Sequence, residues 1–315
     1  MTQQVHKLAL PQDTAHSNLS EADKAFIAQN NLEIARQLLQ AFENSLDRRN
    51  RTILDQLGDL RALLIGQRAP ANAIKLVTDY PVAYQSNDHV KPRGTKDDNT
   101  RSMRFVRAVE NHFGRPVSAL DLGCAGGGLV FDFLVRGHRA FGLEGSDYSI
   151  KSQRAEWRVI GDYLDTCDIT KPFKLLEAGT SKAHKFDVVT MWEVLEHIQE
   201  SDLPQLFANV KAHLAPGGIF VGSAATYDDI ANGVSYHPTV KPESWWQERV
   251  QEFGLQFIDK SMFSFGDFVR GSGNIHSYYD ANFDTNPELG FHFVMTHVEK
   301  KPARGRKTAN VEAIA

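Results

Sequence analysis

The chain has 315 residues, which is enough for about two domains of average size and for a sizeable core. Its 42% hydrophobic and 23% charged residues are typical of a globular protein and exclude a disordered or collagen-like chain. The net charge of −4 argues against nucleic acid or an anionic membrane as a partner of the whole surface. We find neither a signal peptide nor an apolar run of about 18 residues, so we expect a cytoplasmic protein without a membrane partner.

The chain holds two cysteines, Cys124 and Cys167. Two are too few for a disulfide framework, and their spacing is not that of a zinc site. Both lie in apolar, strand-like surroundings, so we expect buried, reduced thiols.

The N-terminal part reads as a tail followed by helix. Residues 1–19 are polar and aperiodic, which predicts a disordered tail. From Ser20, an N-cap-like residue, apolar side chains recur at helical spacing to about Gly66. The stripe consists of Ala35, Leu39, Phe42, Leu46, Ile53 and Leu60. It fits either packing on the chain's own core or pairing with a second copy as a coiled coil, so a homodimer through these helices is one expectation.

A polar loop belongs to the same N-terminal segment, which we place at residues 20–116. Residues 84–100 are rich in Asn, Asp, Gly and Pro, and charged side chains crowd into them. The charged or ionisable residues are Asp88, His89, Lys91, Arg93, Lys96, Asp97 and Asp98. A loop of this length is either a solvated linker or a lid that faces a substrate.

From residue 117 to about residue 300 the pattern changes to alternating strands and helices. Five apolar runs predict an α/β domain with an open, doubly wound, mostly parallel sheet. The runs are VSALDL, HRAFGLE, LDTCDI, KFDVVTMW and GGIFVGSA. We then expect a short helix over about residues 242–253 and two late strands, within LQFIDKSMFSF and GFHFVMTHV, as an antiparallel edge. Residues 301–315 are basic and aperiodic, which predicts a second disordered tail.

A glycine-rich segment stands where the first strand of this sheet turns into a helix. Residues 120–128 read LDLGCAGGG; glycines let the backbone approach a ligand, and the helix N-terminus offers free N–H groups. A nucleotide-type cofactor fits such a turn. The run also fits a degenerate dinucleotide fingerprint, but Asp121, two residues before Gly123, would repel a pyrophosphate and attract a cationic ligand.

Two further acids end the next two strands. Glu144 closes the second run, where a carboxylate can accept both ribose hydroxyls of an adenosine ligand. Asp168 closes the third run, where it is placed for an adenine amino group with Ile169 packed on the ring. Since the carboxyl ends of neighbouring parallel strands meet at one crevice, Asp121, Glu144 and Asp168 together predict a cofactor site.

The sheet segment resembles the class I S-adenosylmethionine-dependent methyltransferases over about residues 117–298. The motifs that carry the resemblance are DLGCAGG, FGLE, DIT, FDVVTMWEVLEHI and LAPGGIF. The resemblance implies a Rossmann-like sheet of seven strands with the last one antiparallel, and S-adenosylmethionine as the cofactor. It implies a set of cofactor-binding residues: Asp121, Gly123, Cys124, Ala125, Gly127, Glu144, Asp168, Ile169 and Trp192. The family's middle glycine is Ala125 here, a departure that we expect the glycines on both sides to accommodate.

Acid and imidazole side chains follow the fourth strand. Glu193, Glu196 and His197 stand at i, i+3 and i+4, a spacing that places them on one face of a short helix, and His237 is the candidate to join them. The resemblance supports a structural role, a general base or a divalent metal site for this segment. Two carboxylates with two imidazoles would suit Mn²⁺, Fe²⁺ or Zn²⁺ better than Mg²⁺. We assign His197 and His237 as catalytic, with a pKa of about 6.5 suited to a base at neutral pH, and do not favour a metal.

Aromatic residues of the C-terminal part have two expected roles. Trp245 and Trp246 are on the short helix and are expected to pack on the sheet. His276, Tyr278 and Tyr279 lie between the two late strands, in a stretch over 266–289 that we interpret as a specificity loop.

The expected function is transfer of the methyl group of S-adenosylmethionine to an oxygen of a small polar acceptor, with a sugar or sugar nucleotide preferred to a phenol. The preference rests on pocket residues that are acidic and imidazole-rich, without a large aromatic cage. One alternative is a metal-dependent RNA 2′-O-methyltransferase, favoured by the histidines and the basic tail and opposed by the net charge of −4. The other is a non-catalytic scaffold that recruits partners through the N-terminal helices.

Overall fold

The computed structural model of the protein describes residues 69–231, 233–272 and 282–298, together with positions 20–22, 24–26, 29–31, 34, 65 and 66. The chain divides into two compact units, Met1–Gly58 and Asp59–Ala315. In the first unit, the described positions from 21 to 34 are helical, as expected after Ser20. The apolar stripe from Ala35 to Leu60 and both predicted tails lie outside the described residues, so the homodimer stays a prediction.

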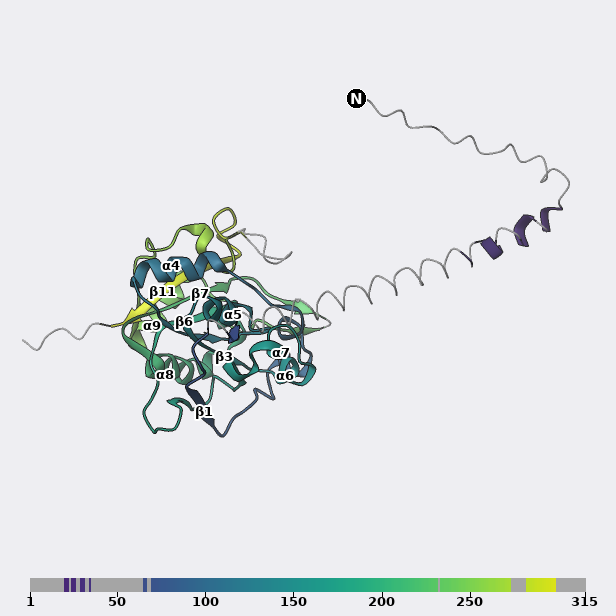
Figure 1. Cartoon of the computed structure of the whole chain (residues 1–315). Helices are drawn as coiled ribbons and strands as arrows, with labels where there is room; N and C mark the ends of the chain where they lie inside the picture. The colour runs from purple at the N-terminus through teal and green to yellow at the C-terminus, as the bar shows by residue number, and fades with distance from the viewer. Residues whose placement is uncertain are drawn as a thin grey trace, which may run out of the picture. The chain divides into compact units, whose positions relative to one another are not determined.

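A seven-stranded sheet forms the centre of the second unit (Figure 1). In spatial order its strands are β10 (Leu255–Phe257), β11 (Gly290–His297), β7 (Leu214–Ala225), β6 (Phe186–Trp192), β2 (Ser118–Leu122), β3 (Arg139–Glu144) and β4 (Leu164–Thr166). β4, β3, β2, β6 and β7 run parallel to one another, and β11 is antiparallel to both β7 and β10. The doubly wound, mostly parallel sheet of seven strands, with the last strand antiparallel, is therefore confirmed; β11 lies between β7 and the edge strand β10.

Helices cover both faces of the sheet, because neighbouring residues of its strands are apolar and point to opposite faces. Leu120 of β2 belongs to the core cluster that it shares with α8 (Leu203–His213) and α9 (Glu243–Glu252). Ala119, the preceding residue, belongs to the cluster shared with α4 (Met103–Phe113), α5 (Gly128–Val135) and α7 (Trp157–Ile160). Trp246 is fully buried and Trp245 packs against the first cluster, so the predicted packing of both is confirmed.

Two antiparallel ribbons lie outside the central sheet. β1 (Ile74–Thr78) pairs with β5 (Phe173–Glu177), and β8 (Ile230–Ala231) pairs with β9 (Val234–Ser235). The sequence did not reveal them, because runs this short give little periodicity. β1 and α4 belong to the unit that holds the sheet, although we expected that domain to begin only at residue 117.

The polar loop over 84–100 contains two helices of one turn, α2 (Asn87–Val90) and α3 (Gly94–Asp97). α2 begins after Ser86, whose side chain accepts a hydrogen bond from the amide of His89. The remaining short helices are α6 (Tyr148–Ser152), η2 (Gly161–Tyr163), η3 (Leu195–His197), η4 (Glu200–Asp202) and η5 (Phe265–Asp267). Within the described part of the chain, no helix has the length and apolar character needed to cross a bilayer.

Candidate active site

The glycine-rich turn joins β2 to α5 at the carboxyl edge of the parallel strands. Gly123 and Gly127 have φ angles of +80° and +83°, which favour glycine. A Cβ atom on Gly123 would lie 2.5 Å from a methyl carbon of Val194, so the turn has no room for one. Ala125, which replaces the family's middle glycine, has a φ of +44°, so the backbone strain lies on Ala125 itself. We had expected the flanking glycines to accommodate this departure.

Asp121 is buried in β2 below this turn, with 8% of its surface exposed. The Thr190 hydroxyl donates a 2.7 Å hydrogen bond to its Oδ1 atom. Burial raises the pKa of Asp121 to about 7 and the nearby Glu144 adds to the rise, against the effect of the Thr190 hydrogen bond. A bound cation would favour the ionised carboxylate, so this environment suits a positively charged cofactor.

Glu144 ends β3 and is buried beside the same turn. Its Oε2 atom accepts a 2.7 Å hydrogen bond from the amide of Ala125. Its Oε1 atom accepts one from the hydroxyl of Thr95 at 2.5 Å and one from the amide of Ser146 at 3.3 Å. Burial raises the pKa of Glu144, while the hydrogen bonds act in the opposite direction. The carboxylate thus faces the turn, as the predicted ribose contact requires.

Asp168 and Ile169 lie beyond the end of β4. The Oδ1 atom of Asp168 accepts hydrogen bonds from the amide and the hydroxyl of Thr170, at 3.0 and 2.6 Å. Ile169 is buried in the core cluster on the α8 face. The side chain of Asp168 therefore stabilises its own turn, and the adenine contacts of both residues stay predictions.

The two cysteines are buried and free, as expected. Burial raises the pKa of Cys167 to about 12 and that of Cys124 well above its usual range. Both therefore stay protonated thiols at neutral pH.

Trp192 ends β6 next to the turn. Its ring lies edge-on to Phe105, with 5.1 Å between ring centroids. Its Nε1 atom is buried without a hydrogen-bond partner among the residues that the structure describes. The indole N–H is thus a buried donor, and the cofactor contact expected for Trp192 stays a prediction.

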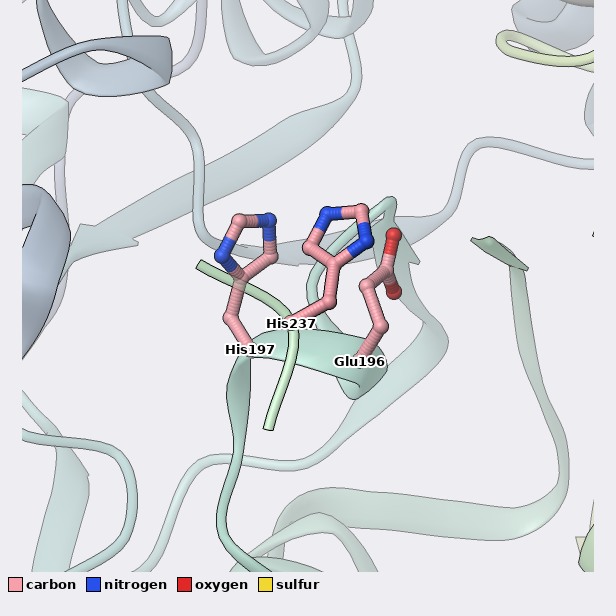
Figure 2. Close-up of side chains that lie close together, drawn as sticks. All are labelled: Glu196, His197 and His237. Carbon is pink, nitrogen blue, oxygen red and sulfur yellow. The ribbon is translucent and has the colours of Figure 1, made fainter. Parts of the chain in front are cut away.

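Glu196, His197 and His237 form a cluster at the carboxyl end of β6 (Figure 2). Each residue offers one possible ligand atom, and these three atoms lie within 4.8 Å of one another. The centroids of the two imidazole rings are 4.7 Å apart. Figure 2 shows the three side chains extending in the same direction, two of them from η3. The structure thus brings together both residues predicted to be catalytic.

Backbone groups hold each member of this cluster. A β7 amide donates a 3.1 Å hydrogen bond to Glu196 Oε1, while Oε2 is buried and has no hydrogen-bond partner in the described part of the chain. His237 Nδ1 donates to the carbonyl of Tyr227 at 2.7 Å, which leaves Nε2 as the acceptor atom of that ring. His197 bonds the carbonyl of Tyr236. Imidazoles fixed in this way present a lone pair to a ligand.

The electrostatics of the cluster change the role expected for His197. Burial and the neighbouring His237 lower the pKa of His197 to about 3, whereas the prediction of a base assumed an ordinary value. Burial and Glu193 raise the pKa of Glu196 well above its usual range. A buried carboxylate oxygen that has no partner among the described residues, next to two imidazoles, fits a divalent cation, with Mn²⁺, Fe²⁺ or Zn²⁺ suited better than Mg²⁺.

Glu193 does not share the predicted helical face. It precedes the 3-10 helix η3 and has a φ of +54°. Its Oε1 atom accepts a 2.5 Å hydrogen bond from the Ser223 hydroxyl. The expectation of an α-helical face here is wrong, because a single tight turn replaces the α-helix that the spacing assumes.

A cavity of about 690 Å³ lies beside the cluster, at the start of β11. Its aromatic walls are Phe263, Phe265, Phe268, Phe283 and Phe291. Thr226 and Val240 also line the cavity. The residue before Thr226, Ala225, donates its amide to Glu196 Oε1 at 3.1 Å. The residue before Val240, Thr239, donates its amide to the Glu196 carbonyl, also at 3.1 Å. The lining thus combines these aromatic side chains with charged ones such as Lys241 and Glu288, and the expected acidic, imidazole-rich acceptor pocket stays a prediction. His276, Tyr278 and Tyr279 lie outside the described residues, so their role in specificity stays a prediction.

Sequence reasoning missed Thr95, Thr190 and the aromatic cavity. Thr190 had a signal, since it is a polar residue inside the apolar run of β6. The phenylalanines also had one, because three of them stand within Phe263–Phe268. Thr95 had none, because a threonine in a polar loop is ordinary.

A family model described as a methyltransferase domain matches residues 89–265, more than half of the chain. The chain therefore belongs to the methyltransferase-domain family. Together with the strand order and the carboxylates at the strand ends, this match defines a class I S-adenosylmethionine-dependent methyltransferase.

Among curated proteins, the chain is similar to enzymes named ubiquinone biosynthesis O-methyltransferase. The protein of Methylobacterium nodulans is 34% identical over 133 residues, which are 39% of this chain and 50% of that protein. The protein of Histophilus somni is 23% identical over 197 residues, 62% of this chain and 76% of that protein. A protein of the same name from Sinorhizobium medicae is 34% identical over 133 residues, which are 38% of this chain and 50% of that protein. The chain therefore spans about half the length of the Methylobacterium and Sinorhizobium proteins.

Solved structures of methyltransferases are also similar. The 1,6-didemethyltoxoflavin-N1-methyltransferase of Burkholderia thailandensis has a TM-score of 0.43 and 17% identity, over 67% of this chain and 84% of that chain. A TehB-like S-adenosylmethionine-dependent methyltransferase of Corynebacterium glutamicum has a TM-score of 0.42 and 15% identity, over 62% and 87% of the two chains. At these scores the likeness adds nothing to the assignment made above.

Proposed function

We propose that the protein is an O-methyltransferase whose acceptor hydroxyl binds at Glu196, His197 and His237. The observation that carries the proposal is the cluster itself, in which two backbone-anchored imidazoles lie close to a carboxylate oxygen that has no hydrogen-bond partner among the described residues. The cluster lies at the carboxyl end of β6, next to the strand that holds Asp121. A hydroxyl held there would stand beside the cofactor.

We further propose a phenolic acceptor in preference to a sugar. The cavity beside the cluster is lined by five phenylalanines, which suit a planar, apolar body. The same cavity also carries charged side chains, among them Lys241, Asp259 and Glu288, which can hydrogen-bond the polar groups of the acceptor. The names of the curated relatives, which are O-methyltransferases of ubiquinone biosynthesis, support the same choice.

The reaction is an in-line displacement in which the acceptor oxygen forms a bond to the methyl carbon as the carbon–sulfur bond breaks. The protein contributes mainly alignment and exclusion of water. We assign acceptance of the hydroxyl proton to His237 Nε2, because Nδ1 of that ring donates to Tyr227. Proton removal of this kind contributes about 10²- to 10⁴-fold. His197 and Glu196 orient the hydroxyl.

A second candidate role for the same cluster is a metal site. Glu196, His197 and His237 would hold the ion, and a bound divalent cation would make the acceptor hydroxyl more acidic. The buried Oε2 atom of Glu196, which no other described residue hydrogen-bonds, favours this role.

A labelled-methyl transfer assay tests both proposals. Catechols and simple phenols, sugar nucleotides, and RNA are offered with S-adenosylmethionine, with and without EDTA. We expect label on the phenols, lost in His237→Ala and Glu196→Gln. Loss in EDTA with rescue by Mn²⁺ assigns the metal role, and unchanged activity in EDTA removes it. Label on sugar nucleotides or RNA alone would overturn the phenolic acceptor.

A further inference from the structure

The carboxylate expected to bind the ribose is already engaged by a residue from another segment. Thr95, in α3, is 2% exposed, and its hydroxyl donates to Glu144 Oε1 at 2.5 Å. The amide of Ser146 shares that oxygen at 3.3 Å, and the amide of Ala125 bonds the other oxygen at 2.7 Å. Three donors therefore surround Glu144.

These donors leave too little of the carboxylate for a ribose. A carboxylate has about four lone-pair positions, and three are in use. A ribose that presents both hydroxyls needs two positions, so one present donor has to leave. Ala125 and Ser146 donate through backbone amides adjoining the glycine turn and the end of β3, whereas Thr95 donates through a side chain on a separate segment.

The segment that carries Thr95 is short, and backbone hydrogen bonds hold it at Thr95 itself and just beyond its C-terminal end. α3 has four residues, and no side chain caps its N-terminus. The amide of Thr95 donates to Asp88 at 2.9 Å, and its carbonyl accepts from the Ser149 hydroxyl at 3.0 Å. One residue beyond α3, the carbonyl of Asp98 accepts from the amide of Gly126 at 3.1 Å. α3 thus rests directly on the glycine turn.

We propose that Thr95 belongs to the cofactor site and competes with the ribose of S-adenosylmethionine for Glu144. Binding of the cofactor breaks the Thr95–Glu144 hydrogen bond and replaces it with a ribose hydroxyl. The competition weakens the binding of cofactor and product alike. S-adenosylhomocysteine is therefore released faster than it would be from the same site without the Thr95 hydroxyl.

The test compares Thr95→Val, which removes the hydroxyl at nearly constant shape, with Thr95→Ser, which keeps it. S-adenosylhomocysteine binding to the full chain is measured by calorimetry. We expect about tenfold tighter binding by the valine variant, the worth of one hydrogen bond to a charged group, and wild-type affinity in the serine variant. Equal or weaker binding by a folded valine variant would overturn the proposal, because Thr95 would then only orient Glu144.

Two additions keep the outcome clear. Adenosine, 2′-deoxyadenosine and 3′-deoxyadenosine are measured with the same variants, and the valine variant should gain most for adenosine, which alone presents both hydroxyls. An equal gain for all three would overturn the competition. If the valine variant melts early, Thr95→Ala replaces it. The inference rests on Glu144 as the ribose ligand and not on the acceptor: a Glu144→Gln variant that binds S-adenosylhomocysteine normally would overturn that assignment alone.

Discussion

Replacing Asp121 by Asn removes a buried charge from the cofactor site and should stabilise the protein at high pH. Thr190 can still donate to the side-chain oxygen of Asn, so the main change is electrostatic. The pKa of Asp121 in the folded protein is about 7, against an ordinary value of 3.8. At about 1.36 kcal/mol for each pKa unit, ionising this group costs the folded state about 4 kcal/mol.

The sign of the effect follows from proton binding. Below pH 3.8 the carboxyl group is protonated in both the folded and the unfolded state, and Asp121 then adds no penalty. Between pH 3.8 and 7 the unfolded chain loses this proton while the folded state keeps it, so wild-type stability falls as pH rises. Above pH 7 the penalty is complete, and the Asn variant has no such penalty.

Urea denaturation of both proteins without cofactor, from pH 4.5 to pH 8.5, measures the free energy of unfolding. We expect the advantage of Asp121→Asn to grow across this range to about 4 kcal/mol and then to level off. The Thr190→Ser variant, which keeps the hydroxyl, should follow the wild-type pH profile. A difference between Asp121→Asn and wild type that does not change with pH would refute the burial argument.

Other residues give sharper single measurements. Glu144→Ala should weaken S-adenosylhomocysteine binding by more than about tenfold in calorimetry, and unchanged affinity would count against the ribose contact. Ala125→Gly should raise the unfolding free energy by about 0.5–1 kcal/mol, because it relieves a φ of +44°, whereas Gly123→Ala should prevent folding or cofactor binding. Asp132→Asn should cost about 1–2 kcal/mol in urea denaturation, because the partly exposed Arg101 guanidinium loses one of two fully buried anions and keeps Glu156, and a loss below about 0.5 kcal/mol would contradict that role.

The sheet and its cofactor edge could be predicted because the sequence marks both locally. Each long strand is an apolar run. Asp121 in β2 and Glu144 in β3 are acidic residues that directly follow apolar ones. Parallel pairing then brings their carboxyl ends together without further information. The glycine turn was equally visible, since its positive φ angles require glycines.

The other parts of the site depend on tertiary contacts that leave little local pattern. Glu193 fits α-helical spacing in sequence, but η3 turns it toward Ser223. The pKa of His197 depends on burial and on His237, 40 positions along the chain. We expected the neighbouring glycines to accommodate Ala125, which was wrong, because they cannot relieve a φ angle that belongs to the alanine itself.

The ribbon of β1 and β5 has a consequence for synthesis on the ribosome. Ile74 pairs with Glu177, so β1 has to wait for about 100 further residues before its partner exists. At about 5–20 residues per second, that interval lasts roughly 5–20 s, during which IKLVT presents unpaired backbone groups. In that interval, the nascent chain is exposed to mispairing and to chaperones at this one strand.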